Sequence, residues 1–370
     1  MKKILFLIHD LGSGGAEKVL VNLVNNLDQT KFDISVITLL GGGVNEQFLA
    51  PHIHYRAVFP KVFRGNSILM KLLTPKQLHR LCVKEEYDIE VSYLEGPSAR
   101  VISGCTNPKT KLVTWIHSIH TSEKQLALSF RSINEMRKCY SRFDKVICVS
   151  NYMRDSMCKL LPVKEKCSVL YNTIESEEVI RKSLEPVEGV FDDSKHMALV
   201  AVGTLKEVKG FERLLKIVKR LVEEEYHIKL YLLGQGPLKN RLQEYISENN
   251  LDDIVTLLGY QLNPYKYVSK CDLYVCSSYS EGFSTAVTES LLVGTPVCTV
   301  DVSGMREMLG ENNEYGVVTE NNEEALYEGI KFLLDNPQKL EFYRENALKR
   351  GKNFRKENTV KAVENELLKL

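Results

Sequence analysis

Short apolar runs alternate with amphipathic segments along almost the whole chain. The first run, residues 4–8, is apolar at consecutive positions, as expected of a strand that is buried on both faces of a parallel sheet. Residues 16–27 follow with apolar side chains at helical spacing, which predicts an amphipathic helix. Further strands are predicted in this half of the chain at residues 32–40, 88–93, 111–116, 145–149 and 168–171.

The alternation starts again after a polar, acidic interval at residues 175–195. Strands alternating with helices form parallel sheets that are covered by helices on both faces, and 370 residues exceed most single cores. We therefore predict an α/β fold with two doubly wound, Rossmann-like domains, residues 1–175 and 176–351, whose strand ends face a cleft. The strands predicted in the second half are residues 197–202, 228–233, 253–258, 273–277 and 296–300, and the last helices are residues 323–334, 338–351 and 359–370.

Charge is distributed unevenly along the chain. The net charge is only +1, but the first half is basic and the second half is acidic. A basic half fits an anionic partner, such as anionic lipid or a diphosphate-linked acceptor, and fits a solvated face without a partner equally well. No stripe of basic and aromatic residues indicates a nucleic-acid interface, so we expect no nucleic-acid partner.

The cysteines and the apolar runs indicate the cellular environment. The nine cysteines are odd in number and scattered, and none forms a Cys-x-x-Cys pair. This pattern is typical of reduced, buried thiols in a cytoplasmic protein and indicates neither a disulfide framework nor a zinc site. No signal peptide is visible, and no apolar run approaches the roughly 20 residues of a membrane span. Any membrane contact is expected to be peripheral, on the cytoplasmic face.

The motif with the clearest chemistry is residues 279–296, which begin after the apolar run at residues 273–276. A strand, a short turn and a helix N-terminus form an anion site, because the first helical amides have no partner within the helix. Glu281 lies before the predicted helix, and Glu289 lies about two turns into it. Carboxylates at such a site are suited to accept hydrogen bonds from hydroxyls, and a sugar nucleotide carries hydroxyls on both sides of its diphosphate. The alternative is an ordinary helix with a glutamate favoured by its dipole.

The segment SEGFSTAVTESLLVGTPV resembles the Glu-x7-Glu signature of the retaining, GT-B-fold glycosyltransferases of family 4. The resemblance implies that Glu281 binds hydroxyls of the donor sugar and that Glu289 binds the ribose hydroxyls. It also implies that the final helix, about residues 352–370, packs back on the first domain, which binds the acceptor, while the second domain binds the nucleotide-sugar donor. The turn between the glutamates would hold the diphosphate on its backbone amides, and its residues are Gly282, Phe283, Ser284 and Thr285.

The glycine-rich turn at residues 12–17 fails as a dinucleotide-binding fingerprint. Glu17 occupies the position that needs Gly or Ala, and no acidic residue ends the second predicted strand. This disfavours an NAD-dependent enzyme. The turn instead resembles the first loop of family 4 enzymes, which implies that Gly15 approaches the donor or acceptor; a merely tight turn is the alternative.

Other motifs extend the resemblance across the chain. His117, at the end of a predicted strand, corresponds to a histidine near the transferred sugar, with His120 as the rival candidate. Residues 203–210 resemble a loop in which Lys209 neutralises the diphosphate. Thr204 stands where the family has an arginine, whose planar fork a threonine cannot replace, and Lys206 is a candidate for partial compensation.

Weaker motifs complete the predicted site. The nucleotide side is expected to include Gly234, Gly236, Pro237 and Tyr260, and Asn172 is expected to be structural between the domains. The chain contains no Asp-x-Asp sequence, the usual metal-holding pair of metal-dependent sugar transferases, so we expect no metal and no cofactor. The predicted catalytic residues are Glu281, His117 and Lys209.

The sequence thus predicts a metal-independent, retaining glycosyltransferase that moves a hexose from an NDP-sugar, expected to be a UDP-hexose, to a glycan or lipid-linked acceptor in cell-surface polysaccharide or capsule synthesis. Loops at residues 43–77 and 121–142 are expected to select the acceptor. Two alternatives remain at this point. One is another GT-B activity, an NDP-sugar epimerase or an inverting transferase. The other is a non-catalytic nucleotide-sugar-binding protein, suggested by the arginine missing at Thr204.

Overall fold

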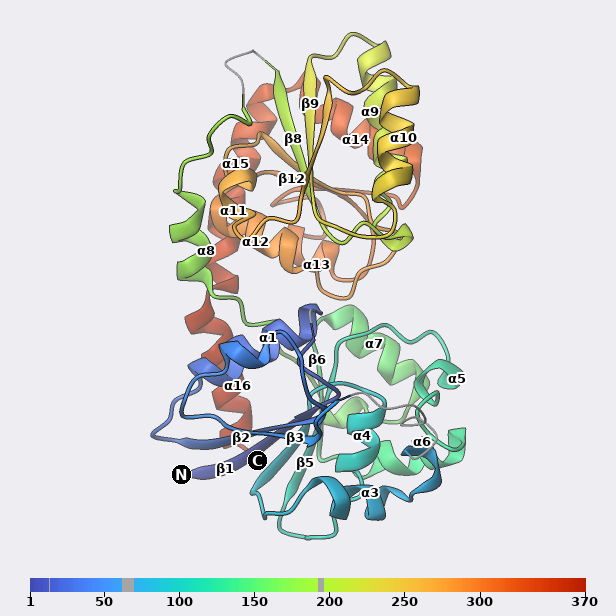
Figure 1. Ribbon diagram of the computed structural model, residues 1–370, viewed down its shortest axis with the longest axis vertical. Coiled ribbons are helices and arrows are strands. Elements are labelled where there is room, and N and C mark those ends of the chain that lie inside the picture. Colours follow the sequence, from blue (N-terminus) through green and yellow to red (C-terminus); the bar gives the residue numbers. More distant parts are fainter. Residues whose placement is uncertain (13, 62–69, 192–195) are drawn as a thin grey trace. The chain divides into compact units, whose positions relative to one another are not determined.

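The computed structural model describes residues 1–12, 14–61, 70–191 and 196–370 (Figure 1). The chain divides into two compact units. Unit 1 comprises Met1–Ile174 together with Glu357–Leu370, and unit 2 comprises Glu175–Lys356. Each unit contains one parallel sheet with helices packed against it, so the predicted fold class is confirmed.

The sheet of unit 1 has seven parallel strands in the order β3-β2-β1-β4-β5-β6-β7. The central strand β1 is apolar and buried from Ile4 to Ile8, and it pairs with β2 on one side and β4 on the other. The strands are β1 (Lys2–Ile8), β2 (Phe32–Leu40), β3 (His54–Phe59), β4 (Ile89–Ser92), β5 (Lys111–Ile116), β6 (Lys145–Cys148) and β7 (Cys167–Val169).

Four helices of unit 1, α3, α5, α6 and α7, begin at side chains that cap their first amides. Ser122, Ser132 and Ser150 each accept a hydrogen bond from a first-turn N–H, and Thr74 forms a complete capping box with Gln77. The helices are α1 (Gly15–Asn26), α3 (Pro75–Cys82), α4 (Pro97–Ile102), α5 (Glu123–Leu126), α6 (Ile133–Ser141), α7 (Asn151–Leu160) and α16 (Lys356–Leu368), with short 3-10 turns η1 (Glu46–Phe48) and η2 (Lys164–Lys166).

The sheet of unit 2 has six parallel strands in the order β10-β9-β8-β11-β12-β13. They are β8 (Met197–Val202), β9 (Ile228–Leu233), β10 (Val255–Gly259), β11 (Leu273–Cys276), β12 (Val297–Val300) and β13 (Val317–Thr319). The helices are α8 (Ser176–Ser183), α9 (Phe211–Glu223), α10 (Lys239–Glu248), α11 (Tyr265–Val268), α12 (Thr285–Val293), α13 (Met305–Leu309), α14 (Glu323–Asp335) and α15 (Pro337–Gly351), with 3-10 turns η3 (Glu207–Lys209) and η4 (Lys352–Phe354).

Several elements were not predicted from the sequence, among them β3, β13 and α8. β3 carries His54, Tyr55 and Arg56 on a half-exposed strand, so it lacks a continuous apolar run. β13 has only three residues. α8 lies inside the interval that was described as polar, and it was missed because many of its residues are charged. The expected acceptor loop at residues 121–142 contains α5 and α6. The expected loop at residues 43–77 contains η1, β3 and the start of α3, and its residues 62–69 lie outside the described part of the chain.

The last helix, α16, belongs to unit 1 and lies against its first strands. Glu364 accepts the backbone N–H of Asp28 at 2.8 Å and pairs with Lys31 at 3.1 Å. Glu366 forms an ion pair with Lys145. Apolar side chains of the same helix, Val363 and Leu367, are buried. The chain therefore returns to unit 1 by a helix that combines apolar burial with charge pairing.

No helix among the residues that the structure describes is long and apolar enough to cross a bilayer.

Substitution of two adjacent leucines can measure how much α16 contributes to the stability of unit 1. Leu367 is fully buried, whereas the side chain of Leu368 is 44% exposed. Leu367→Ala should lower the stability of unit 1 by about 2–5 kcal/mol through lost burial and the cavity it leaves. Leu368→Ala, the matched control, should change it by less than about 0.5 kcal/mol. Urea unfolding followed by fluorescence of the single tryptophan, Trp115 in β5, reports on unit 1 alone. Equal midpoints for the two variants would contradict this account of α16.

Candidate active site

The strand order of unit 2 reverses between β8 and β11, since β9 and β10 lie on one side and β12 and β13 on the other. Ligands of open parallel sheets bind where the loops after such neighbouring strands diverge. The loop after β8 leads into η3, and the loop after β11, residues 277–284, leads into α12. Both motifs with the predicted donor-binding charges lie in these loops.

An ion pair joins the two loops. Lys209 Nζ lies 2.7 Å from Glu281 Oε1, and Ser278 Oγ donates to the same oxygen at 2.5 Å. Ser277 Oγ also donates to the carbonyl of Lys209 at 3.0 Å. The side chains of Lys209 and Glu281 are 27% and 10% exposed, so the pair is largely removed from water but still open to a ligand. Two motifs that are 72 residues apart in the sequence thus form one charged cluster.

A buried arginine on α9 holds the Glu281 loop from behind. Arg213 donates through Nε to the carbonyl of Ser277 at 2.6 Å and through Nη2 to the carbonyl of Ser278 at 2.8 Å. Its Nη1 donates to Asn321 Oδ1 at 2.9 Å, and its guanidinium lies 4.3 Å from the ring centre of Tyr279. A guanidinium can satisfy several carbonyls at once because its donors are fixed in one plane. Arg213 therefore sets the path of the backbone that leads to Glu281.

Arg213 was missed by the sequence analysis, although a charged residue on the apolar face of a predicted helix was an available signal. It does not replace the arginine missing at Thr204, because its guanidinium is only 3% exposed and contacts loop carbonyls. Thr204 and Lys206 are exposed at the surface of their loop. Lys209 is therefore the cation of this loop that the structure pairs with the Glu281 turn.

Close backbone contacts explain the glycines of these loops. Gly210 has φ +63°, and a Cβ there would lie 2.0 Å from the carbonyl oxygen of Ser277. At Gly234, with φ +145°, a Cβ would lie 1.9 Å from the carbonyl oxygen of Gly203. Only glycine combines these φ angles with such an approach. The predicted residues Gly236 and Pro237 follow in the loop that packs against the backbone of residues 203–205.

The N-terminus of α12 presents backbone amides at the same edge of the sheet. Ser284 caps the helix, because its Oγ accepts from the N–H of Val287 at 3.3 Å. The N–H groups of the first turn, beginning at Thr285, have no acceptor within an α-helix. These amides are suited to bind an anion, and they follow the loop of Glu281, which is paired with Lys209 of the loop after β8.

The residues before α12 are fixed by buried contacts. Phe283 is buried, with its ring 6.0 Å from that of Phe354. Ser303, in the loop after β12, donates to the carbonyl of Glu281 and lies 3.2 Å from that of Gly282. Since the Phe283 side chain points into the interior and the carbonyls are engaged, the turn offers backbone amides rather than side chains to a ligand.

Glu289 is held separately from Glu281. Tyr265 on α11 donates its hydroxyl to Glu289 Oε1 at 3.1 Å. Burial, together with the Glu289 charge, raises the pKa of Tyr265, so the phenol remains a donor. Tyr260, which follows β10, is 65% exposed and offers its ring to solvent. The structure thus places the two predicted carboxylates on one loop–helix unit with different partners.

In unit 1 the loop after β4 orients two histidines. Glu95 accepts the backbone N–H of His117 at 3.0 Å through Oε2 and lies 3.4 Å from His120 Nε2 through Oε1. Burial would raise the pKa of Glu95, but hydrogen bonds from His120, Ser118 and the His117 N–H lower it. The backbone of His120 is fixed as well, because Ser156 Oγ donates to its carbonyl at 2.7 Å.

The ring of His117 has one unused nitrogen. It packs 4.8 Å from the ring of Tyr93 and 6.4 Å from that of Trp115. Its Nε2 is buried and has no hydrogen-bond partner among the residues that the structure describes. Burial lowers the pKa of His117 to about 4, with Glu95 acting in the opposite direction. His117 is therefore a neutral imidazole whose Nε2 is buried without a partner among the described residues, whereas His120 is engaged by Glu95.

The contacts of Gly15 and Asn172, the other predicted residues of unit 1, say less about their roles. Gly15 is exposed at the start of α1, and a Cβ there would meet nothing within 4 Å. Packing among the described residues therefore does not require glycine at this position. The neighbouring Ser13 lies outside the described residues. Asn172 is buried near the end of unit 1, and its Oδ1 finds no partner in the described part of the chain.

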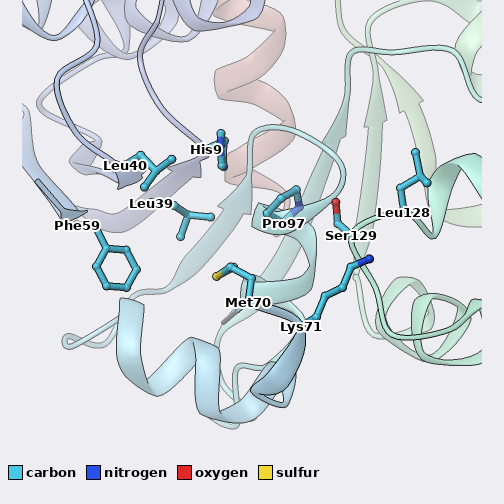
Figure 2. A pocket seen from close by; sticks show the side chains of 9 residues that line it. All are labelled: His9, Leu39, Leu40, Phe59, Met70, Lys71, Pro97, Leu128 and Ser129. Atoms are coloured by element: carbon cyan, nitrogen blue, oxygen red, sulfur yellow. The ribbon is translucent and has the colours of Figure 1, made fainter. Parts of the chain in front are cut away.

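An apolar pocket of about 300 Å³ opens at the carboxyl ends of the strands of unit 1 (Figure 2). His9 follows β1, Leu40 and Phe59 end β2 and β3, and Pro97 begins α4 after β4. This pocket could not be predicted from the sequence, because its walls come from separate segments. Its remaining lining residues are Leu39, Met70, Lys71, Leu128 and Ser129.

Protonation of His117 should make unit 1 less stable in acid. The pKa of its imidazole falls from 6.5 in the unfolded chain to about 4 in the fold, so the unfolded chain binds the extra proton first. The contribution of His117 to stability is complete above about pH 6.5 and declines as the pH falls toward 4. Between pH 7 and pH 5 the melting temperature of His117→Gln should therefore fall less than that of the wild type, as measured by Trp115 fluorescence. The exposed His54→Gln is the control and should keep the wild-type pH dependence. The same dependence in all three proteins would contradict a neutral His117.

Comparisons with known proteins agree with this architecture. Residues 13–178 match the family described as "Glycosyltransferase Family 4", and residues 188–350 match "Glycosyl transferases group 1". A Campylobacter jejuni protein named N-acetylgalactosamine-N,N'-diacetylbacillosaminyl-diphospho-undecaprenol 4-alpha-N-acetylgalactosaminyltransferase is 31% identical over 367 residues, which cover 96% of each chain.

Solved structures with the same fold include HepE of Anabaena in complex with UDP and the apo form of the lipopolysaccharide outer core galactosyltransferase WaaB. HepE is 19% identical with a TM-score of 0.77 over 100% of both chains, and WaaB is 18% identical with a TM-score of 0.77 over 99% of both chains. The sequence relative, the two family matches and the two Rossmann-like sheets show that this chain belongs to the group 1 glycosyltransferases of family 4, with the GT-B fold.

Proposed function

We propose that this protein is a retaining hexosyltransferase that uses an NDP-sugar, in particular a UDP-hexose, and a hydroxyl of a lipid-linked glycan acceptor. The observation that carries the proposal is the Lys209–Glu281 pair beside the N-terminus of α12, where a cation, a carboxylate and helix amides lie together. This combination suits a ligand that has both a diphosphate and sugar hydroxyls. Unit 2 would bind the donor, and unit 1 the acceptor.

Each group of unit 2 has a distinct role in this proposal. Glu281 accepts hydrogen bonds from the transferred sugar, and Glu289, oriented by Tyr265, accepts them from the ribose. Amides at Phe283, Ser284 and Thr285 bind the diphosphate. Lys209 lies close enough to Glu281 to contact sugar and phosphate together. The base would lie toward the loops at Gly234, Gly236, Pro237 and Tyr260, with Thr204 at the rim.

Charge developing on the leaving diphosphate would be stabilised by the Lys209 ammonium and the α12 amides. These groups supply the positive charge that a divalent metal supplies in other transferases, so we propose transfer without a metal or another cofactor. We favour displacement on the same face of the sugar, in which the leaving phosphate takes the proton of the acceptor hydroxyl. His117, a neutral imidazole whose buried Nε2 has no partner among the described residues, would form one hydrogen bond with a hydroxyl at the reacting centre.

Two observations favour a lipid-linked acceptor. The Campylobacter relative is named for a diphospho-undecaprenol acceptor. Unit 1 also carries an apolar pocket with His9 and Lys71 among its lining residues, which would suit an acceptor that is partly apolar and partly anionic. The basic first half of the chain would favour contact with the cytoplasmic face of a membrane, and synthesis of a cell-surface polysaccharide or capsule is the proposed context.

Donor binding can be tested without knowing the acceptor. A thermal-shift screen against UDP-, GDP- and ADP-sugars should show stabilisation by a UDP-hexose, by about 2.7 kcal/mol at a concentration of about 100 Kd. Glu289→Gln should weaken that binding about tenfold, which is about 1.4 kcal/mol, because the ribose loses a charged acceptor. Glu328→Gln on the exposed face of α14 is the matched control and should bind as the wild type does. If no nucleotide sugar raises the melting temperature, the donor assignment is wrong.

Transfer itself can be tested with an undecaprenyl-diphosphate-linked sugar and the donor identified by the screen. Glu281→Gln should lower kcat by about 10²–10³-fold while the protein still binds UDP. Activity should not need added Mg²⁺ or Mn²⁺, and proton NMR of the product should show the donor's anomeric configuration. An inverted anomer would instead identify an inverting enzyme, and UDP-hexose binding without turnover on any acceptor would favour a non-catalytic role.

A further inference from the structure

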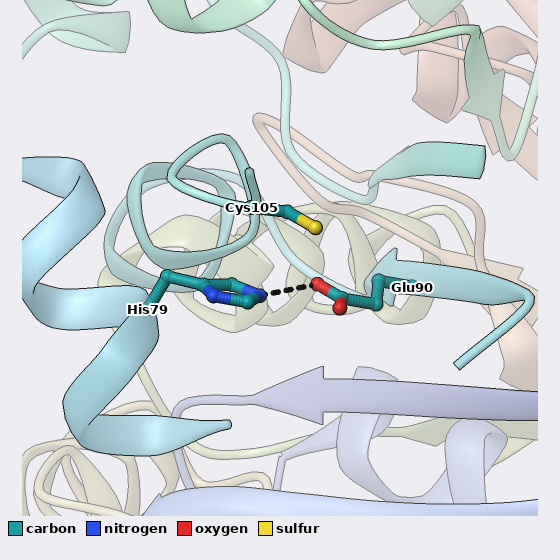
Figure 3. Close-up of side chains that lie close together, drawn as sticks. All are labelled: His79, Glu90 and Cys105. Carbon is teal, nitrogen blue, oxygen red and sulfur yellow. Dashed lines mark hydrogen bonds and ion pairs between the residues drawn. The ribbon is translucent and has the colours of Figure 1, made fainter. Parts of the chain in front are cut away.

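A histidine, a glutamate and a cysteine that have no role in the proposed reaction converge inside unit 1. His79 lies on α3, Glu90 is the second residue of β4, and Cys105 lies just after α4. Figure 3 shows the three side chains pointing toward one another. Their potential ligand atoms all lie within 4.8 Å of one another, and His79 Nε2 is 2.7 Å from Glu90 Oε2.

The surroundings of Glu90 are those of a core. Glu90 is 1% exposed, and its register neighbours on the adjacent strands are Leu5 of β1 and Leu112 of β5. A carboxylate moved from water into such a place costs several kcal/mol unless a cation and hydrogen bonds compensate it. Some positive charge is therefore required at this position in the fold.

A protonated His79, paired with Glu90 and hydrogen-bonded to Cys105, could provide that charge, and a metal ion bound by all three side chains is the other way to supply it. Cys105 is 2% exposed and directs its thiol at the same point as the other two side chains. A carboxylate, a thiolate and a neutral imidazole together balance the charge of a divalent ion. Nitrogen, sulfur and carboxylate ligands are those that zinc takes, whereas Ca²⁺ and Mg²⁺ select oxygen.

We propose that His79, Glu90 and Cys105 form a zinc site. Zinc bonds of about 2.0–2.3 Å place tetrahedral ligands about 3.3–3.8 Å apart. The 2.7 Å separation of His79 and Glu90 and the 4.8 Å limit of the cluster bracket these values, so small side-chain adjustments admit the ion. His79 is the most exposed of the three, and water on its side provides the fourth ligand.

The position of the site indicates a structural role. The ion joins α3, β4 and the segment after α4, three parts of unit 1 that are separate in the sequence. Gly104 allows this approach, since a Cβ there would lie 1.9 Å from the carbonyl oxygen of Pro75 at the start of α3. Zinc here stabilises unit 1 and takes no part in sugar transfer, so the site is independent of the proposed metal-free reaction.

A second group of thiols must be separated from this site in any test. Cys158 Sγ lies 3.8 Å from Cys167 Sγ, and the Cys167 thiol also interacts with Cys148. These cysteines could bind soft metals by themselves. Cys167→Ala is therefore the matched control for Cys105→Ala, because each variant removes one thiol of a different cluster.

The experiment uses the full chain, produced with zinc, kept reduced and desalted. Mass spectrometry of the metal should find about one zinc per chain in the wild type and in Cys167→Ala, and about tenfold less in Cys105→Ala. Replacing zinc by Co²⁺ should give a thiolate-to-cobalt absorption band in the first two proteins and none in Cys105→Ala. Zinc retained by Cys105→Ala, or lost from Cys167→Ala instead, would overturn the assignment.

A failure of Cys105→Ala to fold would not remove the test, because the wild type alone gives a second readout. Chelation of zinc should lower the melting temperature reported by Trp115 in unit 1, and added zinc should restore it. His79→Gln provides another variant that keeps all nine thiols and should lose the ion. A wild type that shows no cobalt–thiolate band and no change on chelation holds no zinc at this cluster, and the proposal is then wrong.

Discussion

The candidate donor site depends on the pairing of Lys209 with Glu281 across two loops of unit 2. A largely buried ion pair is not stable by its charges alone, because desolvation offsets much of their attraction. Here Ser278 adds a hydrogen bond to the carboxylate, and Arg213 holds the loop carbonyls in place from the interior. The pair is thus fixed before any ligand binds. In the proposed reaction, a donor that enters beside the α12 amides would meet preorganised charge instead of having to order it.

Unit 1 uses a carboxylate in a different way. Glu95 accepts a hydrogen bond from the backbone N–H of His117 and contacts the ring of His120. The same carboxylate therefore positions both histidines but engages the ring of His120 alone. The ring of His120 contacts Glu95, while that of His117 is neutral, with a buried Nε2 that lacks a partner in the described part of the chain. Burial and the partner of each ring distinguish the two histidines, and His117 stays the predicted functional residue with His120 as its rival. Their types and spacing could not show this difference.

Much of the fold could be predicted because parallel strands buried on both faces appear as continuous apolar runs. β1, β2, β5, β8 and β9 are found within two residues of the predicted bounds, whereas the half-exposed edge strand β3, the three-residue β13 and the solvated helix α8 were missed. The roles of the candidate site residues remain proposals. Arg213 and the apolar pocket of unit 1 could not be predicted, because their partners come from segments that are distant in the sequence.

The sequence by itself determined the family, the two α/β units and the residue types at the ends of the strands, since local spacing encodes each of these. Only the tertiary structure decided which groups meet. It pairs Lys209 with Glu281, leaves Thr204 exposed without a replacement arginine, and joins His79, Glu90 and Cys105 from three segments that share no spacing motif. The physical reason is that charge pairing and burial depend on distances through space, which the packing of the sheets and helices sets and which sequence separation does not reveal.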